Sequence, residues 1–281
     1  MSVPVRDAAT VMLVRDAVDE AGAPAVEVCM LRRNLEAEFV AGAYVFPGGS
    51  VDEADRSPGV EAWCRGRTDA EASAVLGVPS GGLGFWVAAL RECFEEAGVL
   101  VAHPRGHPDG DALLDTSDPA TAARFADYRD RVNARSLRLL DLCRAEDLEL
   151  VVDDVHYVSH WITPALAPKR YDTRFFVTTA PTEQVALHDG GETISTIWVR
   201  PDDMLGRFRR GELELLPPTV VNLEALGRFD STAAVRAWAS TVTDVPTVLP
   251  VVTVAEGRFV VLHPGDVGYE EAAAGSLGAT G

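Results

Sequence analysis

Short apolar runs with β-branched side chains predict strands near the start of the chain and again in its second half. Segments rich in Gly, Asp or Pro separate these runs and mark turns. The last run has the form of a short hairpin, with Glu256 and Gly257 at its turn. The predicted strands and hairpin lie at residues 9–14, 25–33, 156–164, 173–180, 193–200 and 250–264.

Residues 84–98, GFWVAALRECFEEAG, have the apolar period of a helix. Trp86, Leu90 and Cys93 recur at helical spacing and form one apolar stripe. Gly98 is expected to end this helix in the left-handed conformation. The pattern therefore predicts a helix with one buried face.

Further helices are predicted after this one. A charged helical segment is expected at about 119–148, and shorter helices near 201–210, 218–227 and 231–241. The tail from residue 269 is rich in Ala, Gly and Glu and is expected to be frayed. Strands on both sides of one long helix, with more helices after them, indicate an α+β domain.

Composition and net charge argue against several classes of protein. The net charge of −18 over 281 residues argues against nucleic acid as a partner, because phosphate backbones need a basic surface. The four cysteines stand far apart, which argues against a zinc site or a disulfide framework and favours a reducing compartment. The chain shows no signal peptide and no apolar run long enough to span a membrane. We therefore expect a cytoplasmic protein with no membrane partner.

The candidate metal-binding and catalytic residues lie at the end of the predicted helix, in the segment RECFEEAG. Glu92, Glu95 and Glu96 are spaced i, i+3 and i+4, so their carboxylates share one helical face. Arg91 can pair with Glu95, but one arginine cannot neutralise three carboxylates. Oxygen-rich sites of this kind suit Mg²⁺ or Mn²⁺. Taken alone, the same run is also typical of a solvated helix face.

A second feature is the stretch YVFPGGSVDEAD at residues 44–55, where two glycines precede several acids. At Gly48 and Gly49 the bare backbone would let a carbonyl approach a cation without obstruction. The alternative is an acidic surface turn. The two features together favour one metal site over two unrelated surface segments.

These residues resemble the box of the Nudix hydrolases, G-x5-E-x7-R-E-U-x-E-E-x-G-U, where U is a bulky aliphatic residue. Gly49 opens the box, and RECFEEAGV at residues 91–99 matches its second half, with Cys93 in one U position. Asp55 stands where the first Glu belongs. The box spacing of seven residues is extended to 35 (residues 56–90), so 28 residues are inserted inside it.

Such an insertion makes the chain similar to one branch of that family, the coenzyme A and acyl-coenzyme A diphosphatases first associated with animal peroxisomes. The resemblance rests on the stretches GAYVFPGGSVDEAD, RECFEEAGVLV, HWITP, KRYDTRFFV and ELLPPTVVNLEAL. It implies a single Nudix domain, an α/β/α sandwich with a mixed sheet. The implied parts are a core at about 8–55, 84–102 and 154–229, mainly helical insertions at 56–83 and 103–150, and an extension at 230–281.

The resemblance also implies roles for the box residues. Glu95 and Glu96 would be metal ligands, Glu92 a ligand or the general base, and the Gly48 carbonyl a further ligand. Arg91 would orient the glutamates in catalysis, and Asp55 would tie the glycine corner to the helix. In some members the base is an acid from a later loop; Glu192 is the candidate here and Asp189 a weaker one. An exposed loop acid is the alternative for Glu192.

A coenzyme A ligand would need cations for its phosphates, and an arginine fork suits a phosphate. The basic candidates share strand or loop positions: Arg32, Arg33, Lys169, Arg170 and Arg174. For each one alone, the alternative is an ion pair on an acidic protein.

The implied function is Mg²⁺- or Mn²⁺-dependent hydrolysis of coenzyme A or acyl-coenzyme A to 3′,5′-ADP and the corresponding 4′-phosphopantetheine. Hydrolysis of NADH, ADP-ribose or another nucleoside diphosphate derivative is the first alternative. A Nudix-fold protein that binds a nucleotide without turnover is the second. The expected partner is a small nucleotide of the coenzyme A type, and the sequence leaves a homodimer open.

Overall fold

Strand β1 (Val5–Val18) forms the middle of the main sheet and buries both of its faces. Val11 and Leu13 point into one apolar core, whereas Met12 and Val14 point into a second core on the opposite side. A strand buried on both sides requires a layer on each face. The computed structural model describes residues 3–35, 42–106, 112–255 and 258–278.

The main sheet has eight strands and is mixed, as expected. Its order is β10-β2-β1-β9-β8-β11, with β3 paired to β2 and β4 paired to β1. β1 runs parallel to β9 and antiparallel to β2, while β8 and β9 are antiparallel. The strands joining β1 are β2 (Pro24–Arg33), β3 (Tyr44–Val45), β4 (Gly48–Ser50), β8 (His156–Ile162), β9 (Arg170–Thr179), β10 (Thr193–Val199) and β11 (Thr247–Val248).

The short strands β3 and β4 fill the space where β1 and β2 separate. β2 pairs with β1 only along residues 24–28, and its later residues 31 and 32 pair with β3. β4 pairs with residues 8–10 of β1. This arrangement carries the glycine corner into the sheet beside β1.

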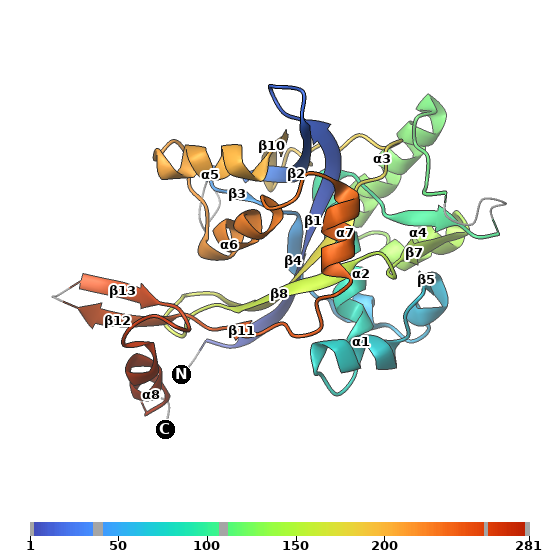
Figure 1. Ribbon diagram of the computed structural model, residues 1–281. Helices are drawn as coiled ribbons and strands as arrows, with labels where there is room; N and C mark the ends of the chain where they lie inside the picture. The colour runs from blue at the N-terminus through green and yellow to red at the C-terminus, as the bar shows by residue number, and fades with distance from the viewer. Residues whose placement is uncertain (1–2, 36–41, 107–111, 256–257, 279–281) are drawn as a thin grey trace.

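Helices cover both faces of the sheet (Figure 1). Helix α2 (Leu83–Glu92) packs on one face of β1, and its apolar residues, including Trp86, form the core there. Helices α5 (Pro201–Arg209), α6 (Pro217–Leu226) and α7 (Thr232–Ala239) cover the other face. The predicted α/β/α sandwich is therefore observed.

The two insertions meet in a small sheet that the sequence did not predict. The first contains η2 (Val60–Trp63), β5 (Cys64–Arg65) and α1 (Asp69–Leu76). In the second, β6 (Ala102–Pro104) is followed by α3 (Pro119–Asn133), α4 (Leu139–Ala145) and β7 (Leu148–Val151). β5 and β6 both pair with β7, which joins the insertions. The predicted helical segment at 119–148 is thus two helices that lead into a strand.

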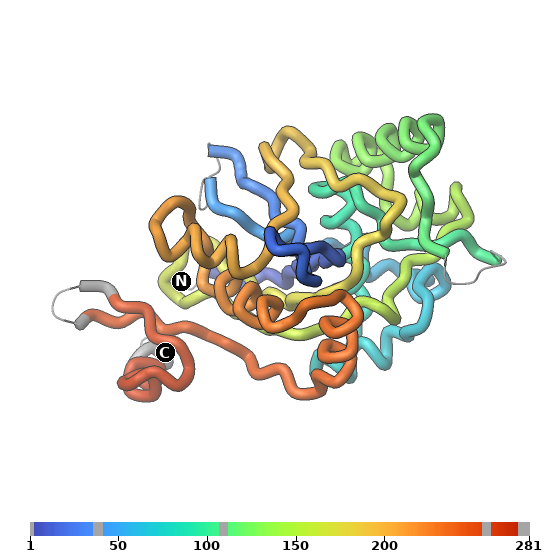
Figure 2. Tube along the Cα trace, turned by 45° about the horizontal axis from the view of Figure 1, so that its top comes forward, coloured from blue at the N-terminus to red at the C-terminus, as the bar shows by residue number. Residues whose placement is uncertain are grey.

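The end of the chain forms an arm that projects from the body in two views (Figures 1 and 2). It consists of the predicted hairpin, β12 (Val251–Ala255) and β13 (Arg258–Leu262), and helix α8 (Tyr269–Gly278). The expectation of a frayed tail from residue 269 is wrong for this helix; the predicted turn residues Glu256 and Gly257 lie outside the described residues. None of the helices within the described ranges combines the length and the hydropathy of a membrane span.

Candidate metal and diphosphate site

The candidate site is built at the C-terminal end of α2. The helix continues into a π turn, η3 (Cys93–Ala97), and ends at Gly98, whose φ of 71° is left-handed as predicted. The Gly98 amide donates to the Phe94 carbonyl at 3.0 Å. Single π turns inside helices are frequent at functional sites. Here the turn carries Glu95 and Glu96, while Glu92 lies at the last residue of α2.

Arg91 holds the acids of this region together. Its Nη1 donates to Glu92 Oε1 at 2.8 Å and to Glu95 Oε1 at 3.1 Å. Its Nη2 donates to the Ser50 carbonyl at 2.7 Å, beside the glycine corner. The side chain is buried, so these contacts are shielded from water. Arg91 is therefore saturated by protein contacts and orients the glutamates.

Asp55 forms the other side of the Arg91 network. It lies in η1 (Glu53–Arg56), directly after the glycine corner, and accepts from Arg91 Nε at 3.0 Å and Nη2 at 3.1 Å. It also accepts from the Asp52 amide at 2.8 Å. Burial raises the pKa of Asp55, although Arg91 and the amide lower it in part. Asp55 thus connects the corner to α2, although 35 residues (56–90) separate it from Arg91 in the sequence.

The two glycines contact the glutamates directly. The Gly48 amide donates to Glu96 Oε2 at 2.9 Å. A β-carbon on Gly49 would lie 2.5 Å from Glu92 Oε1, so only glycine leaves room for this carboxylate. The corner therefore packs against the glutamates, as the two sequence features together indicated. The contact observed for Gly48 is made by its amide, and a metal contact through its carbonyl stays a prediction.

Negative charge in the site exceeds what Arg91 can balance. Burial raises the pKa of Glu92 to about 7, and the neighbouring Glu95 contributes in the same direction. Burial and the charge of Glu92 place the pKa of Glu96 well above its ordinary value. Burial also raises the pKa of Glu95, which Arg91 and Arg135 lower in part. A hard divalent cation would relieve this repulsion.

The donor set fits such a cation, because it consists of carboxylate oxygens. Arg91 engages one oxygen each of Glu92 and Glu95, and Gly48 engages one oxygen of Glu96. In this arrangement, no three His, Cys, Asp or Glu side chains among the described residues are already gathered into a metal site. The ligand assignment of these glutamates therefore stays a prediction.

Glu192 lies near the glutamates, as part of the loop before β10. Its Oε1 accepts from Arg33 Nη2 at 2.9 Å, and its charge contributes to the raised pKa of Glu96. The side chain is 55% exposed. Asp189 instead accepts from the amides of Glu192 and Thr193 at 3.1 and 2.9 Å. Burial raises the pKa of Asp189 less than these bonds lower it, so Asp189 holds the loop.

Neighbouring arginines of β2 lie on opposite faces of the sheet. Arg33 pairs with Glu192, and its charge acts on Glu96, so it lies on the glutamate side. Arg32 donates to the Gly42 carbonyl at 3.4 Å and stacks over Tyr44, which belongs to the opposite core. The structure therefore brings Arg33, and not Arg32, to the site, because side chains alternate along a strand.

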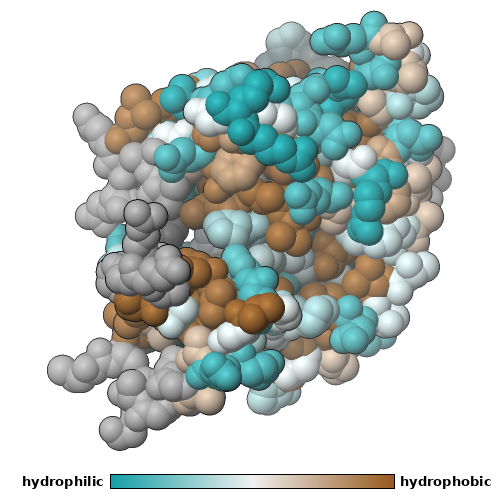
Figure 3. Space-filling model, turned by 60° about the vertical axis from the view of Figure 1, so that its left-hand side comes forward, coloured by the Kyte–Doolittle hydropathy of each residue, from teal (hydrophilic) through white to brown (hydrophobic). Residues whose placement is uncertain are grey.

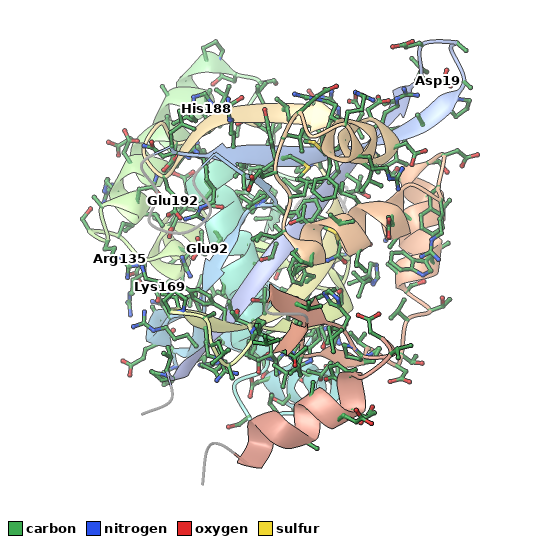
Figure 4. The ribbon with its side chains drawn as sticks, turned by 90° about the vertical axis from the view of Figure 1, so that its left-hand side faces the viewer. Asp19, Glu92, Arg135, Lys169, His188 and Glu192 are labelled. Atoms are coloured by element: carbon green, nitrogen blue, oxygen red, sulfur yellow. The ribbon has the colours of Figure 1, made fainter. Side chains whose placement is uncertain are left out.

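The basic residues of KRYDTRFF are not brought together as a group. Arg174 is 5% exposed, forms an ion pair with Asp172 and lies over Phe85 beneath α2. Arg170 donates from Nε to the Thr163 carbonyl at 3.1 Å. Lys169 is exposed and lies on the same side of the molecule as Glu92 (Figure 4). Of these three candidates, Arg174 is placed where a phosphate cannot reach it without rearrangement.

Helix α3 supplies contacts that the sequence analysis missed. Arg129 Nε and Asn133 Nδ2 donate to the Glu95 carbonyl at 2.9 and 3.3 Å. Arg135, just beyond the helix, pairs with Asp52 at 3.2 Å. The only signal in the sequence was the high charge of this segment, which reads as an ordinary solvated face.

Figure 3 draws a neighbouring view of the molecule, in which apolar residues lie in the middle of the visible face with hydrophilic residues around them. Figure 4 shows Glu92, Arg135, Lys169 and Glu192 on the same side. The side that bears the acidic site therefore also carries basic groups.

Comparisons with known proteins agree with this architecture. The family model described as the NUDT19 Nudix domain matches residues 67–226. The chain is 29% identical over 302 residues to a Gallus gallus protein named acyl-coenzyme A diphosphatase NUDT19, covering 95% of this chain and 80% of that protein. The Homo sapiens protein of the same name is 29% identical over 269 residues, covering 86% and 72%.

Among solved structures, a Nudix hydrolase from Alicyclobacillus acidocaldarius superposes with a TM-score of 0.65 at 25% identity. The superposition covers 87% of this chain and 99% of that protein. The shared architecture thus extends beyond the residues that the family model matches, which begin after Gly49 and Asp55.

Proposed function

The chain belongs to the NUDT19 Nudix domain family, whose model matches 67–226 of its 281 residues, and on this premise we propose that it cleaves the diphosphate of coenzyme A or acyl-coenzyme A. Two relatives that match most of the chain are named acyl-coenzyme A diphosphatases. The products would be 3′,5′-ADP and 4′-phosphopantetheine or its acyl derivative.

The observation that carries the proposal is the convergence of three box glutamates on Arg91 and the glycine corner. Glu92, Glu95 and Glu96 would hold Mg²⁺ or Mn²⁺. When bound, the ions neutralise the diphosphate and acidify the attacking water. Arg91 keeps Glu92 and Glu95 oriented through its hydrogen bonds at 2.8 and 3.1 Å. The residues of α2 before Glu92 are buried, which fixes the backbone on which Glu92 stands.

Two acids are candidates for the general base. Glu192 is exposed and pairs with Arg33, so it would reach a water without leaving the loop. Glu92 has a pKa of about 7 because it is buried, a value suited to accepting a proton near neutral pH. Ligation of a cation would lower that value, so we assign the base to Glu192 and the ligand role to Glu92.

Substrate binding would use the basic groups on this side. Arg33, which pairs with Glu192, and Lys169, which lies on the same side as Glu92, would meet phosphates, and Arg170 follows Lys169 at the start of β9. Arg32 and Arg174 are directed elsewhere and are left out of the proposed site.

We place the enzyme in a reducing compartment, the cytoplasm. All four cysteines are free, and three of them are buried. The expectations that the protein has no nucleic-acid partner and no membrane partner stay predictions, and a homodimer stays open.

The test is a panel of diphosphate substrates with Mg²⁺ or Mn²⁺, with products identified by mass. Coenzyme A and acyl-coenzyme A are expected to give 3′,5′-ADP and 4′-phosphopantetheine or its acyl derivative. Their hydrolysis is expected to be faster than that of NADH or ADP-ribose. Glu96→Gln is expected to lower kcat on the order of 100-fold or more while the protein stays folded. Glutamine still offers an oxygen to the Gly48 amide but removes one anionic ligand.

Glu224→Gln is the matched control, because Glu224 is an exposed acid on α6, across the sheet from the site. It is expected to leave turnover unchanged. Faster hydrolysis of NADH or ADP-ribose would show that the proposed substrate is wrong, while the proposed hydrolysis of a diphosphate would stand. Binding of coenzyme A with no turnover under any metal would instead favour a nucleotide-binding protein.

A further inference from the structure

Arg135 has a backbone conformation that is unfavourable for its residue type. It follows α3 with a φ of 55°, in the left-handed region where a helix normally ends on glycine. The Ser136 amide donates to the Arg131 carbonyl at 2.9 Å, which closes the helix around this residue. Among the described non-glycine residues, only Arg135 and Asp147 have a positive φ. Such outliers concentrate at functional sites.

The place of Arg135 is fixed by the end of α3. Arg129 and Asn133 hold this end of the helix on the Glu95 carbonyl, in the last turn of the glutamate-bearing helix. Arg135 Nη1 lies 3.2 Å from Asp52 Oδ2, in the acidic stretch after the glycine corner. Arg135 therefore stands between the two segments that form the site, and Figure 4 shows it on the same side as Glu92.

The Arg135 guanidinium is available to a ligand. The side chain is 81% exposed, and its ion pair with the partly exposed Asp52 is of the kind that contributes little. A phosphate offers the Arg135 guanidinium two oxygens and carries more negative charge than a carboxylate, so it can replace Asp52 as the partner. Arg91, by contrast, is buried and fully engaged by protein groups. Arg135 reaches the edge of the carboxylate cluster from outside.

We propose that Arg135 is a substrate-binding residue that grips a phosphate of the diphosphate substrate at the mouth of the glutamate site. The second insertion thus contributes to substrate recognition as well as to the fold. The inference deepens the proposed function and rests on it. The phosphate bound is either in the cleaved diphosphate or at the 3′ position of coenzyme A.

The competing explanation is structural, in which Arg135 only ends α3 and pairs with Asp52. The two explanations differ for Arg135→Gly. Glycine relieves the backbone and removes the cation, so a purely structural residue would be replaced without loss of activity. A phosphate-binding residue would give a more stable protein that binds substrate less well.

We expect Arg135→Gly to raise Tm and to raise KM by about 10- to 100-fold, the cost of one charged hydrogen-bonded contact. kcat is expected to change much less, because the box glutamates are untouched. Arg135→Lys keeps the charge without the fork and is expected to recover part of the lost affinity.

Two controls separate charge from backbone relief. Asp147→Gly relieves the other positive-φ residue, which lies between α4 and β7, and should raise Tm without changing KM. Arg131→Ala removes an exposed arginine from the same helix, where it pairs with Asp127 at 3.5 Å, and should leave KM unchanged.

A comparison with dephospho-coenzyme A, which lacks the 3′-phosphate, shows which phosphate Arg135 binds. A KM increase for coenzyme A alone assigns Arg135 to the 3′-phosphate, and an equal increase for both substrates assigns it to the diphosphate. Unchanged KM for both in Arg135→Gly overturns the inference while leaving the proposed function in place. If the wild type hydrolyses only NADH or ADP-ribose, the proposed substrate is wrong, and the same KM comparison on that substrate decides the role of Arg135.

Discussion

The two glycines of the corner are adjacent, yet a side chain would meet different obstacles at each. A β-carbon on Gly48 would lie 2.7 Å from the Ala9 carbonyl and 2.7 Å from the Thr10 Cα, which are backbone atoms of the paired strand. On Gly49 it would meet the carboxylate of Glu92, the end of a side chain. Gly48 is therefore required by the sheet and Gly49 by the site.

This difference predicts opposite outcomes for two single substitutions. Gly48→Ala is expected to destabilise the fold by about 1–3 kcal/mol, because β4 must move away from β1. Gly49→Ala is expected to change stability by no more than about 1 kcal/mol, since Glu92 can turn away. It should nevertheless lower kcat by about 10- to 100-fold through misplacement of that carboxylate.

Chemical denaturation and metal-dependent turnover of both variants provide the measurement. Full activity in Gly49→Ala would mean that Glu92 does not need its present position. Unchanged stability in Gly48→Ala would mean that β4 is not held against β1 as described.

At the scale of elements, the last turn of the glutamate helix depends on α3. A π turn leaves carbonyls that the helix itself does not satisfy, and the Glu95 carbonyl is one that Arg129 and Asn133 cap from the second insertion. Arg129 also packs against Gly98, where a β-carbon would lie 3.0 Å from its Nη1. The insertion thus supports the turn that carries Glu95 and Glu96.

Arg129→Ala is accordingly expected to cost about 1–3 kcal/mol of stability through a poorly satisfied carbonyl. It should also raise the metal concentration needed for half-maximal activity, because Glu95 and Glu96 lose their support. Thermal unfolding and a metal titration of activity test both effects. Arg131→Ala serves as control, and a stability loss with an unchanged metal requirement would show that α3 does not position the ligands.

For the molecule as a whole, the acidic site is a source of instability that a cation can remove. The pKa of Glu92 is raised by burial from its ordinary 4.5 to about 7 in the folded protein. A raised pKa contributes stability that is present in full below 4.5 and is lost as pH rises through 7. The metal-free protein should therefore lose stability across this interval.

We expect the Tm of the metal-free protein to fall between pH 5 and pH 8, and saturating Mg²⁺ to restore it most at pH 8. Each kcal/mol corresponds to roughly 2–4 °C in a protein of this size. The Glu92→Gln variant has no charge to bury at this position. Its Tm without metal should therefore fall less between pH 5 and pH 8, and at pH 8 it should be higher than that of the metal-free wild type. A metal-free Tm that rises over the interval in the wild type would contradict the burial of this charge.

Much of the protein could be predicted from local patterns. Apolar spacing predicted the main strands and the helix ending at Gly98, and the box residues indicated that Gly49, Asp55 and the helix acids meet. The strands and the helix are encoded by neighbours in the sequence, since period and turn residues act over a few positions. Resemblance to a known box added the contact between Asp55 and the helix, which no spacing alone could show.

The sequence by itself determined the elements and the acidic face of the glutamate helix, because both depend on residues a few positions apart. Tertiary structure decided which basic residues reach that site: Arg33 faces it, Arg174 is buried beneath α2, and Arg135 arrives on an insertion. Arginines look alike in a sequence, and their roles depend on strand alternation, burial and contacts between distant segments. Chain folding sets those distances, so only the three-dimensional arrangement distinguishes them.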